Sequence, residues 1–247
     1  MKANIPVQKG EVIEINITGL GSSGEGVGKY QGFTVFVPGA LPTETIKAKV
    51  VLVKKNYASG RIVEIVEASA ERVEPACPVY KECGGCQLQH LSYAGQLKMK
   101  EQQVRDALTR IGHLDTEVLP VMGCANPWNY RNKMQFPAAM GAEGKIEIGC
   151  YATATHSVVD TEGCLIQKEA NNQVLVAVRK WMQKFNVTAY DEKTGKGLVR
   201  HVMSRVGVNS GSLEKNLVEK YGGVIPNDMD ELLSMPGIGR KIANLLL

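Results

Sequence analysis

Three closely spaced cysteines carry the clearest chemical signal in this sequence. Cys77, Cys83 and Cys86 stand in the stretch CPVYKECGGCQLQH, in the pattern C-x5-C-x2-C. Cysteine thiolates are ligands for both zinc and iron–sulfur clusters. Gly84 and Gly85 allow the backbone to wrap closely around an inorganic core and to point amides at its sulfides. The spacing therefore predicts a metal site.

The remaining cysteines bear on which metal is bound. A [4Fe–4S] cluster uses four thiolates, and the fourth here must be Cys124, Cys150 or Cys164. Spacing alone leaves these three alternatives open. Structural zinc sites usually combine two C-x2-C-like pairs, and a second pair is missing, so we favour iron–sulfur over zinc.

Basic residues form a second group with possible function. The segment 45–61 has no acidic residue, and a local basic strip of this kind suits a phosphate backbone. A solvated strand face is the alternative. The candidate RNA-binding residues are Lys47, Lys49, Lys54, Lys55 and Arg61 in this strip, together with Arg131 and Lys133 further along the chain.

The elements that position these residues indicate an α+β protein. Short apolar runs separated by glycine-rich and proline-containing turns predict a small, OB-like β-barrel over residues 1–67. After the cysteines we expect a helix capped by Ser92, strands over 130–159 and a second helix over 168–185. The apolar face of this second helix, which includes Trp181, is expected to pack in the core.

At these residues the sequence resembles the RNA (uracil-5-)-methyltransferase family, in particular its 23S ribosomal RNA branch with an iron–sulfur cluster. The resemblance covers residues 1 to about 208, and the N-terminal strands resemble the RNA-binding TRAM domain. The motifs that carry it are Cys77 and Cys83 to Cys86, Gln87, Gln89 and His90, Tyr130 to Lys133, Gly149 to Cys164, and LVRHVMSRVG from Leu198.

The resemblance implies methyl transfer from S-adenosylmethionine to C5 of a uridine in ribosomal RNA. It implies Cys164 as the fourth ligand of a [4Fe–4S] cluster in a central domain over residues 75–208. A cysteine thiolate would attack C6 of the flipped-out uracil, and a base would later remove the C5 proton.

The family's S-adenosylmethionine-binding α/β domain is expected after residue 208 and is missing there. No cysteine follows Cys164, and no glycine-rich donor-binding loop is found in the tail. We therefore assign no catalytic or S-adenosylmethionine-binding residue. The expectation is a chain that binds RNA without turnover, and whether it is an enzyme stays open. A non-catalytic RNA-binding module is an alternative.

The tail, residues 213–247, resembles the helix-hairpin-helix segment of the endonuclease III family. Its Gly-x-Gly turn, Gly237 to Gly239, would offer backbone amides to a DNA phosphate. Lys241 falls where that family has its catalytic lysine, so a DNA glycosylase or lyase is a second alternative. We interpret the join as a mis-joined gene product rather than a genuine fusion.

The sequence has no apolar run of membrane-spanning length and no signal-peptide core near its start. We therefore expect a cytoplasmic protein without a membrane partner. In that compartment structural disulfides are rare, which agrees with a metal-binding role for the clustered cysteines.

Overall fold

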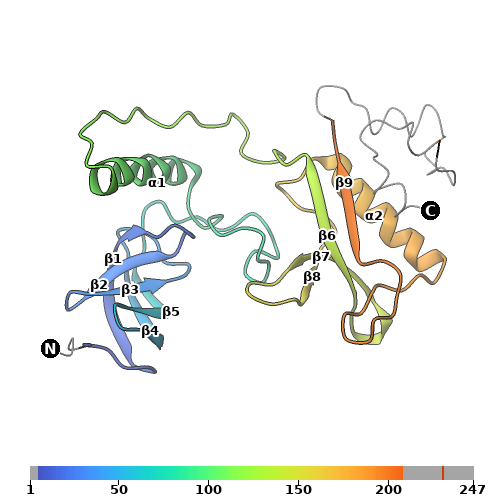
Figure 1. Cartoon of the computed structure of the whole chain (residues 1–247), viewed down its shortest axis with the longest axis horizontal. Helices are drawn as coiled ribbons and strands as arrows, with labels where there is room; N and C mark the ends of the chain where they lie inside the picture. Colours follow the sequence, from blue (N-terminus) through green and yellow to red (C-terminus); the bar gives the residue numbers. More distant parts are fainter. Residues whose placement is uncertain (1–4, 208–229, 231–247) are drawn as a thin grey trace. The chain divides into compact units, whose positions relative to one another are not determined.

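The computed structural model describes residues 5–207 and Asp230, and these form two compact units (Figure 1). Within the described ranges, unit 1 comprises residues 5–80 and 86–124, and unit 2 comprises residues 81–85 and 125–207. The predicted hairpin of the tail and Lys241 lie outside the described residues. In the described ranges, no helix is both long and apolar enough to span a membrane.

Unit 1 begins with a closed five-stranded barrel whose strand order is β1-β2-β3-β5-β4. Neighbouring strands are antiparallel except for β3 and β5, which run parallel. Closure pairs every strand on both sides and leaves no exposed sheet edge. The predicted N-terminal barrel is thus confirmed. Its strands are β1 (Val12–Leu20), β2 (Gly26–Tyr30), β3 (Phe33–Val37), β4 (Thr45–Val53) and β5 (Tyr57–Glu67).

The barrel interior is filled by alternate side chains, as the two-residue period of a strand requires. Ile13, Ile15 and Ile17 of β1 are buried in this core, while the residues between them are exposed. Gly28 of β2 is needed because a Cβ at this position would lie 2.4 Å from the backbone oxygen of Asn16. The close approach of β1 and β2 therefore depends on glycine.

A buried ion pair ties the barrel to the segment that follows it. Glu44 lies just before β4, and its side chain is fully buried. Arg72 donates from Nε to Oε1 of Glu44 (2.5 Å) and from Nη2 to Oε2 (2.8 Å). The amides of Leu41 and Ser69 also donate to this carboxylate. Both carboxylate oxygens thus have donors, as a buried charge requires.

The first predicted helix is confirmed as α1 (Tyr93–Asp106), which continues as a π-helical segment, Ala107–Ile111, up to Gly112. Ser92 caps the helix, because its hydroxyl accepts a hydrogen bond from the amide of Gly95 (2.9 Å). Gly95 is the one buried residue of α1. The helix therefore lies largely on the surface of unit 1.

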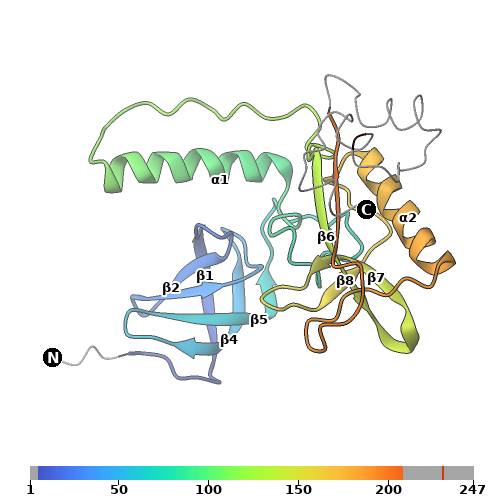
Figure 2. The same ribbon diagram turned by 45° about the vertical axis from the view of Figure 1, so that its right-hand side comes forward.

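Unit 2 contains a four-stranded antiparallel sheet with the order β8-β7-β6-β9. One helix, α2 (Glu169–Lys184), packs against β7 and β9, and Figure 2 shows it running beside the sheet. This arrangement confirms the α+β class. The strands are β6 (Lys133–Met140), β7 (Ile146–Tyr151), β8 (Val158–Asp160) and β9 (His201–Arg205).

The predicted apolar face of α2 is only partly the face that packs on the sheet, since Val174 and Val178 pack against the core but Trp181 and Phe185 are exposed. The buried residues are Asn171, Leu175 and Met182, spaced four and seven residues apart along one stripe. Trp181 is 44% exposed, and its ring lies tilted beside that of Phe185, which is 59% exposed. The prediction of Trp181 as a core residue was wrong because the buried stripe passes along the neighbouring helix positions.

The Glu44–Arg72 pair predicts a large stability effect. We expect Arg72→Ala to lower the free energy of unfolding by roughly 3–5 kcal/mol, since it leaves a buried carboxylate without its cation. Lys98→Ala removes the exposed partner of Glu71 and should cost no more than about 1 kcal/mol. Urea unfolding followed by circular dichroism compares the two variants.

The same pair predicts a pH dependence. Burial alone would raise the pKa of Glu44, but Arg72 and the amides of Leu41 and Ser69 outweigh it and lower the pKa below 4.5. Stability from this group is present above pH 4.5 and lost as the pH falls through the lowered pKa. The difference in the free energy of unfolding between wild type and Arg72→Ala should therefore become smaller in acid. A difference that stays constant with pH would contradict this account.

Candidate nucleic-acid interface and cysteine site

The barrel presents the predicted basic strip on β4, β5 and the turn between them. Lys49 lies directly opposite Arg61 in the β4–β5 ladder. Neither side chain forms an ion pair with any residue in 5–207. Like charges placed opposite one another across two strands are unfavourable unless an anion neutralises them. Lys54 and Lys55 lie exposed in the turn.

Lys47 differs from the other residues of the strip. Its Nζ lies 2.8 Å from Oε2 of Glu64, the cross-strand neighbour on β5. This hydrogen bond and the nearby negative charge raise the pKa of Lys47. The ammonium group of Lys47 thus already has an anionic partner, and its role as a phosphate ligand stays a prediction.

Unit 2 contains a second group of exposed cations. Lys133 at the start of β6 lies opposite Arg205 at the end of β9, and Arg131 precedes Lys133 by two residues. None of the three forms an ion pair with another described residue. Arg205 was missed from the sequence because its place beside Lys133 depends on the register of β9, which no local motif fixes.

The unit 1 part of the cysteine motif is held by Tyr80 and His90. The Tyr80 hydroxyl lies 2.8 Å from the Gln87 carbonyl and 2.6 Å from Nδ1 of His90. Burial and the charge of Arg72 lower the pKa of His90, which favours the neutral ring. Tyr80 can then donate to Gln87 and accept from Nδ1–H of His90. The amide of Cys77 donates to Gln89 (3.2 Å).

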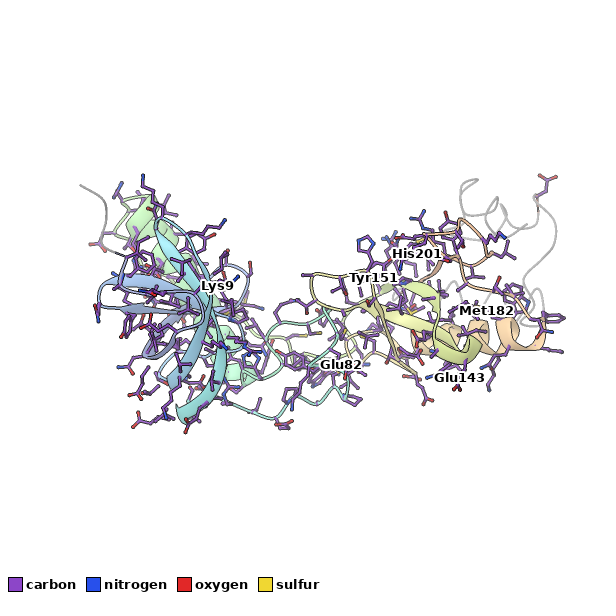
Figure 3. All side chains as sticks on the ribbon, turned by 90° about the horizontal axis from the view of Figure 1, so that it is seen from below. Lys9, Glu82, Glu143, Tyr151, Met182 and His201 are labelled. Carbon is purple, nitrogen blue, oxygen red and sulfur yellow. The ribbon has the colours of Figure 1, made fainter. Side chains whose placement is uncertain are left out.

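The unit 2 part of the motif contains Cys83. Its thiol shares a hydrogen bond with Cys150, and its sulfur accepts one from the amide of Gly85 (3.3 Å). These interactions outweigh burial and lower the pKa of Cys83 to about 6. The amide of Gly84 donates to the carbonyl of Tyr151, which Figure 3 labels. A Cβ at Gly85 would lie 3.3 Å from both sulfurs, so glycine lets the loop close over them.

The four predicted cluster ligands are divided between the units. Cys77 and Cys86 belong to unit 1, while Cys83 and Cys164 belong to unit 2. Among the described residues, no three cysteine, histidine or acidic side chains are gathered as for a metal ion. None of the six cysteines, all in the described ranges, forms a disulfide, so the thiol chemistry that a cluster needs is present. The ligand set stays a prediction.

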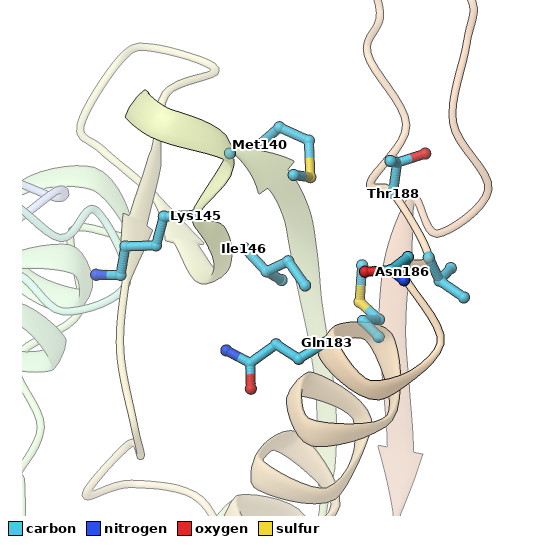
Figure 4. Close-up of a pocket in the computed structure, with 9 residues that line it drawn as sticks. Met140, Lys145, Ile146, Gln183, Asn186 and Thr188 are labelled. Atoms are coloured by element: carbon cyan, nitrogen blue, oxygen red, sulfur yellow. The ribbon is translucent and has the colours of Figure 1, made fainter.

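A pocket in unit 2 is lined mainly by apolar and neutral polar residues (Figure 4). Lys145 is the charged residue among those lining it, and its ammonium pairs with Asp160 (3.0 Å). No cysteine, histidine or carboxylate is among the residues lining this pocket. Its lining residues are Met140, Gly144, Lys145, Ile146, Met182, Gln183, Asn186, Val187 and Thr188.

Comparisons with known proteins place this geometry in context. Residues 6–63 match the family model of the TRAM domain, and residues 220–247 match that of the helix-hairpin-helix motif. An uncharacterized RNA methyltransferase of Clostridium tetani is 47% identical over 221 residues, covering 89% of this chain and 48% of that protein. One from Halalkalibacterium halodurans is 41% identical over 240 residues, covering 92% of this chain and 52% of that protein.

A solved structure shares the fold. It is the tRNA (uracil-54, C5)-methyltransferase of Pyrococcus abyssi in complex with S-adenosyl-L-homocysteine, with a TM-score of 0.58 and 23% identity. The match covers 81% of this chain and 44% of that one. The chain spans about half the length of the curated relatives it matches. The resemblance to RNA methyltransferases with a TRAM domain is confirmed, and the glycosylase alternative centred on Lys241 is not favoured.

The Lys133–Arg205 pair predicts that removing one charge stabilises the protein when no anion is bound. We expect Arg205→Gln to raise the free energy of unfolding by roughly 0.2–1 kcal/mol at low salt, because a cross-strand repulsion is removed. The gain should shrink at high salt. Lys145→Gln, which breaks an ion pair with Asp160, is the matched control and should not raise the free energy of unfolding. Thermal unfolding at two salt concentrations tests this prediction. If Arg205→Gln destabilises the protein, Arg205 has a structural role instead.

Proposed function

We propose that this chain, a relative of the RNA methyltransferases that carries a TRAM domain, supplies the RNA-binding part of an S-adenosylmethionine-dependent RNA (uracil-5-)-methyltransferase. Its proposed RNA is ribosomal, as the resemblance of the cysteine motif to the 23S branch implies. The observation that carries the proposal is the presence of two cross-strand cation pairs, Lys49 with Arg61 and Lys133 with Arg205, one in each unit.

RNA phosphates are the anions that suit these pairs. A protein fold gains nothing from placing two cations opposite each other, and no acidic side chain of the described residues neutralises either pair. Phosphates of a nucleic acid bring closely spaced negative charges and release counterions on binding. Contacts of this kind position an RNA without reading its sequence.

Methyl transfer itself needs a cysteine nucleophile and a general base near the target uracil. We assign neither role to a described residue. Cys83 and Cys150 lie in contact with each other, which suits a metal site or a thiol pair better than a nucleophile beside a base. The role that we propose for the described residues is therefore the binding of RNA.

The proposal includes a [4Fe–4S] cluster held by Cys77, Cys83, Cys86 and Cys164. The lowered pKa of Cys83 supplies a thiolate near neutral pH, and Gly85 leaves room beside its sulfur. The cluster would stabilise the cysteine loop and the RNA-binding surface, with no required redox role. Cys150 is the competing candidate for the fourth ligand, since it contacts Cys83.

The salt dependence of RNA binding tests the barrel's role. Replacing Lys49, Lys54, Lys55 and Arg61 with alanine should weaken binding of single-stranded RNA. It should also flatten the slope of log K against log salt by about 0.7 for each phosphate that the variant no longer neutralises. Lys98→Ala on α1, paired with Glu71, is the control. An unchanged slope in the fourfold variant would place the RNA site elsewhere.

Metal analysis after anaerobic purification tests the cluster. We expect a brown protein with about four iron and four sulfide per chain. Cys164→Ser should lose most of both, whereas Cys124→Ser, the matched control, should keep them. If Cys150→Ser loses the iron and sulfide while Cys164→Ser keeps them, the fourth ligand is Cys150 and not Cys164. A colourless protein that holds zinc would contradict the iron–sulfur assignment.

A further inference from the structure

Two aromatic side chains pack together on the outside of the barrel. Phe36 of β3 and Tyr57 of β5 meet edge to face, with ring centroids 5.5 Å apart and an interplanar angle of 84°. Val35, Val37 and Ala58, their chain neighbours, point inward and are buried. Phe36 and Tyr57 therefore contribute to the outer surface, and Tyr57 is 39% exposed.

Phe36 fixes the orientation of the Tyr57 ring. Edge-to-face pairs hold aromatic rings in a defined geometry and add to the energy of area burial. Tyr57 also starts β5 directly after a tight turn, where the amide of Lys54 donates to the Tyr57 carbonyl (2.8 Å). The ring is thus a pre-oriented apolar surface open to solvent.

Cations surround this aromatic pair. Lys29 of β2 is opposite Thr34 of β3, and Thr34 is opposite Tyr57, which places Lys29 about 10 Å away across two strand spacings. Arg61 is on the same outward face of β5, about 13 Å along the strand. Lys54 and Lys55 occupy the adjoining turn.

These cations have no acidic partner within the described ranges. The acidic side chains near the other end of β5 are already engaged, since Glu64 pairs with Lys47 and Glu67 accepts from Thr45. The surface therefore combines an apolar ring with unneutralised positive charge. A base with its flanking phosphates has the complementary chemistry.

We infer that Tyr57, held in place by Phe36, stacks on an unpaired base of the RNA, while Lys29, Lys54, Lys55 and Arg61 bind the adjacent phosphates. The inference rests on the proposed RNA-binding function and adds that the bound RNA is unpaired. Base faces are accessible in single strands and loops but are covered by neighbouring pairs in a duplex. The barrel is thus specific for unpaired RNA.

Binding of the full chain to three RNA probes tests the inference. The probes are a single strand of about 12 nucleotides, a length that one barrel of this kind can bind, the same strand with abasic sites in its central positions, and the duplex. Tyr57→Ala should weaken binding of the intact single strand by about 5- to 150-fold. Wild type should lose affinity for the abasic strand by a similar factor, whereas Tyr57→Ala should bind both strands equally.

Two further variants separate stacking from other effects. Tyr57→Phe keeps the ring and should bind like wild type. Phe185→Ala removes an exposed aromatic side chain that follows α2 and should leave affinity unchanged. The abasic probe acts on unaltered protein, so a folding defect cannot produce its result.

Equal affinity of wild type for the intact, abasic and duplex probes would overturn the inference while leaving RNA binding in place. Unchanged affinity in Tyr57→Ala would overturn it as well. Failure of the wild type to bind any of the three probes would instead contradict the proposed function on which the inference rests.

Discussion

The buried ion pair between Glu44 and Arg72 is the contact on which the arrangement of unit 1 depends. A carboxylate that is fully enclosed at the end of the barrel is stable only with its cation and hydrogen-bond donors in place. Arg72 supplies the cation, and its second nitrogen also donates to the carbonyl of Gly39 (2.7 Å). The segment after β5 must therefore return to the barrel, where Ser69 donates its amide to the same carboxylate.

The return of this segment positions one side of the cysteine motif. Arg72 forms a backbone bridge with Leu91, and the amide of Val73 donates to the carbonyl of His90 (3.0 Å). His90 in turn contacts Tyr80, which holds the carbonyl of Gln87. A chain of direct contacts thus connects a charge buried in the barrel with the loop that precedes α1. The same charge on Arg72 helps to keep the His90 ring neutral.

Local patterns in the sequence predicted the features that depend on local physics. The short strands of the N-terminal barrel and the Ser92 cap of α1 could both be predicted, because each depends on residues near in sequence. The face of α2, the Lys47–Glu64 pair and the Lys133–Arg205 pair could not, because each is set by strand register or helix rotation in the folded chain. Sequence motifs were enough to predict the TRAM domain and the relation to RNA methyltransferases. The contact between Cys150 and Cys83 was not predicted, because it depends on how the chain folds, and the choice of Cys164 as a cluster ligand stays a prediction.

Unneutralised like-charge pairs reduce the stability of a fold, and each of the two units carries one. Lys49 with Arg61 and Lys133 with Arg205 lie in different sheets, and each pair is unfavourable without an anion. On the proposed function, the phosphates of RNA are the anions that neutralise each pair. Binding of RNA would therefore relieve a repulsion within each unit as well as add an attraction, so each cross-strand pair would be more stable with RNA bound than without it.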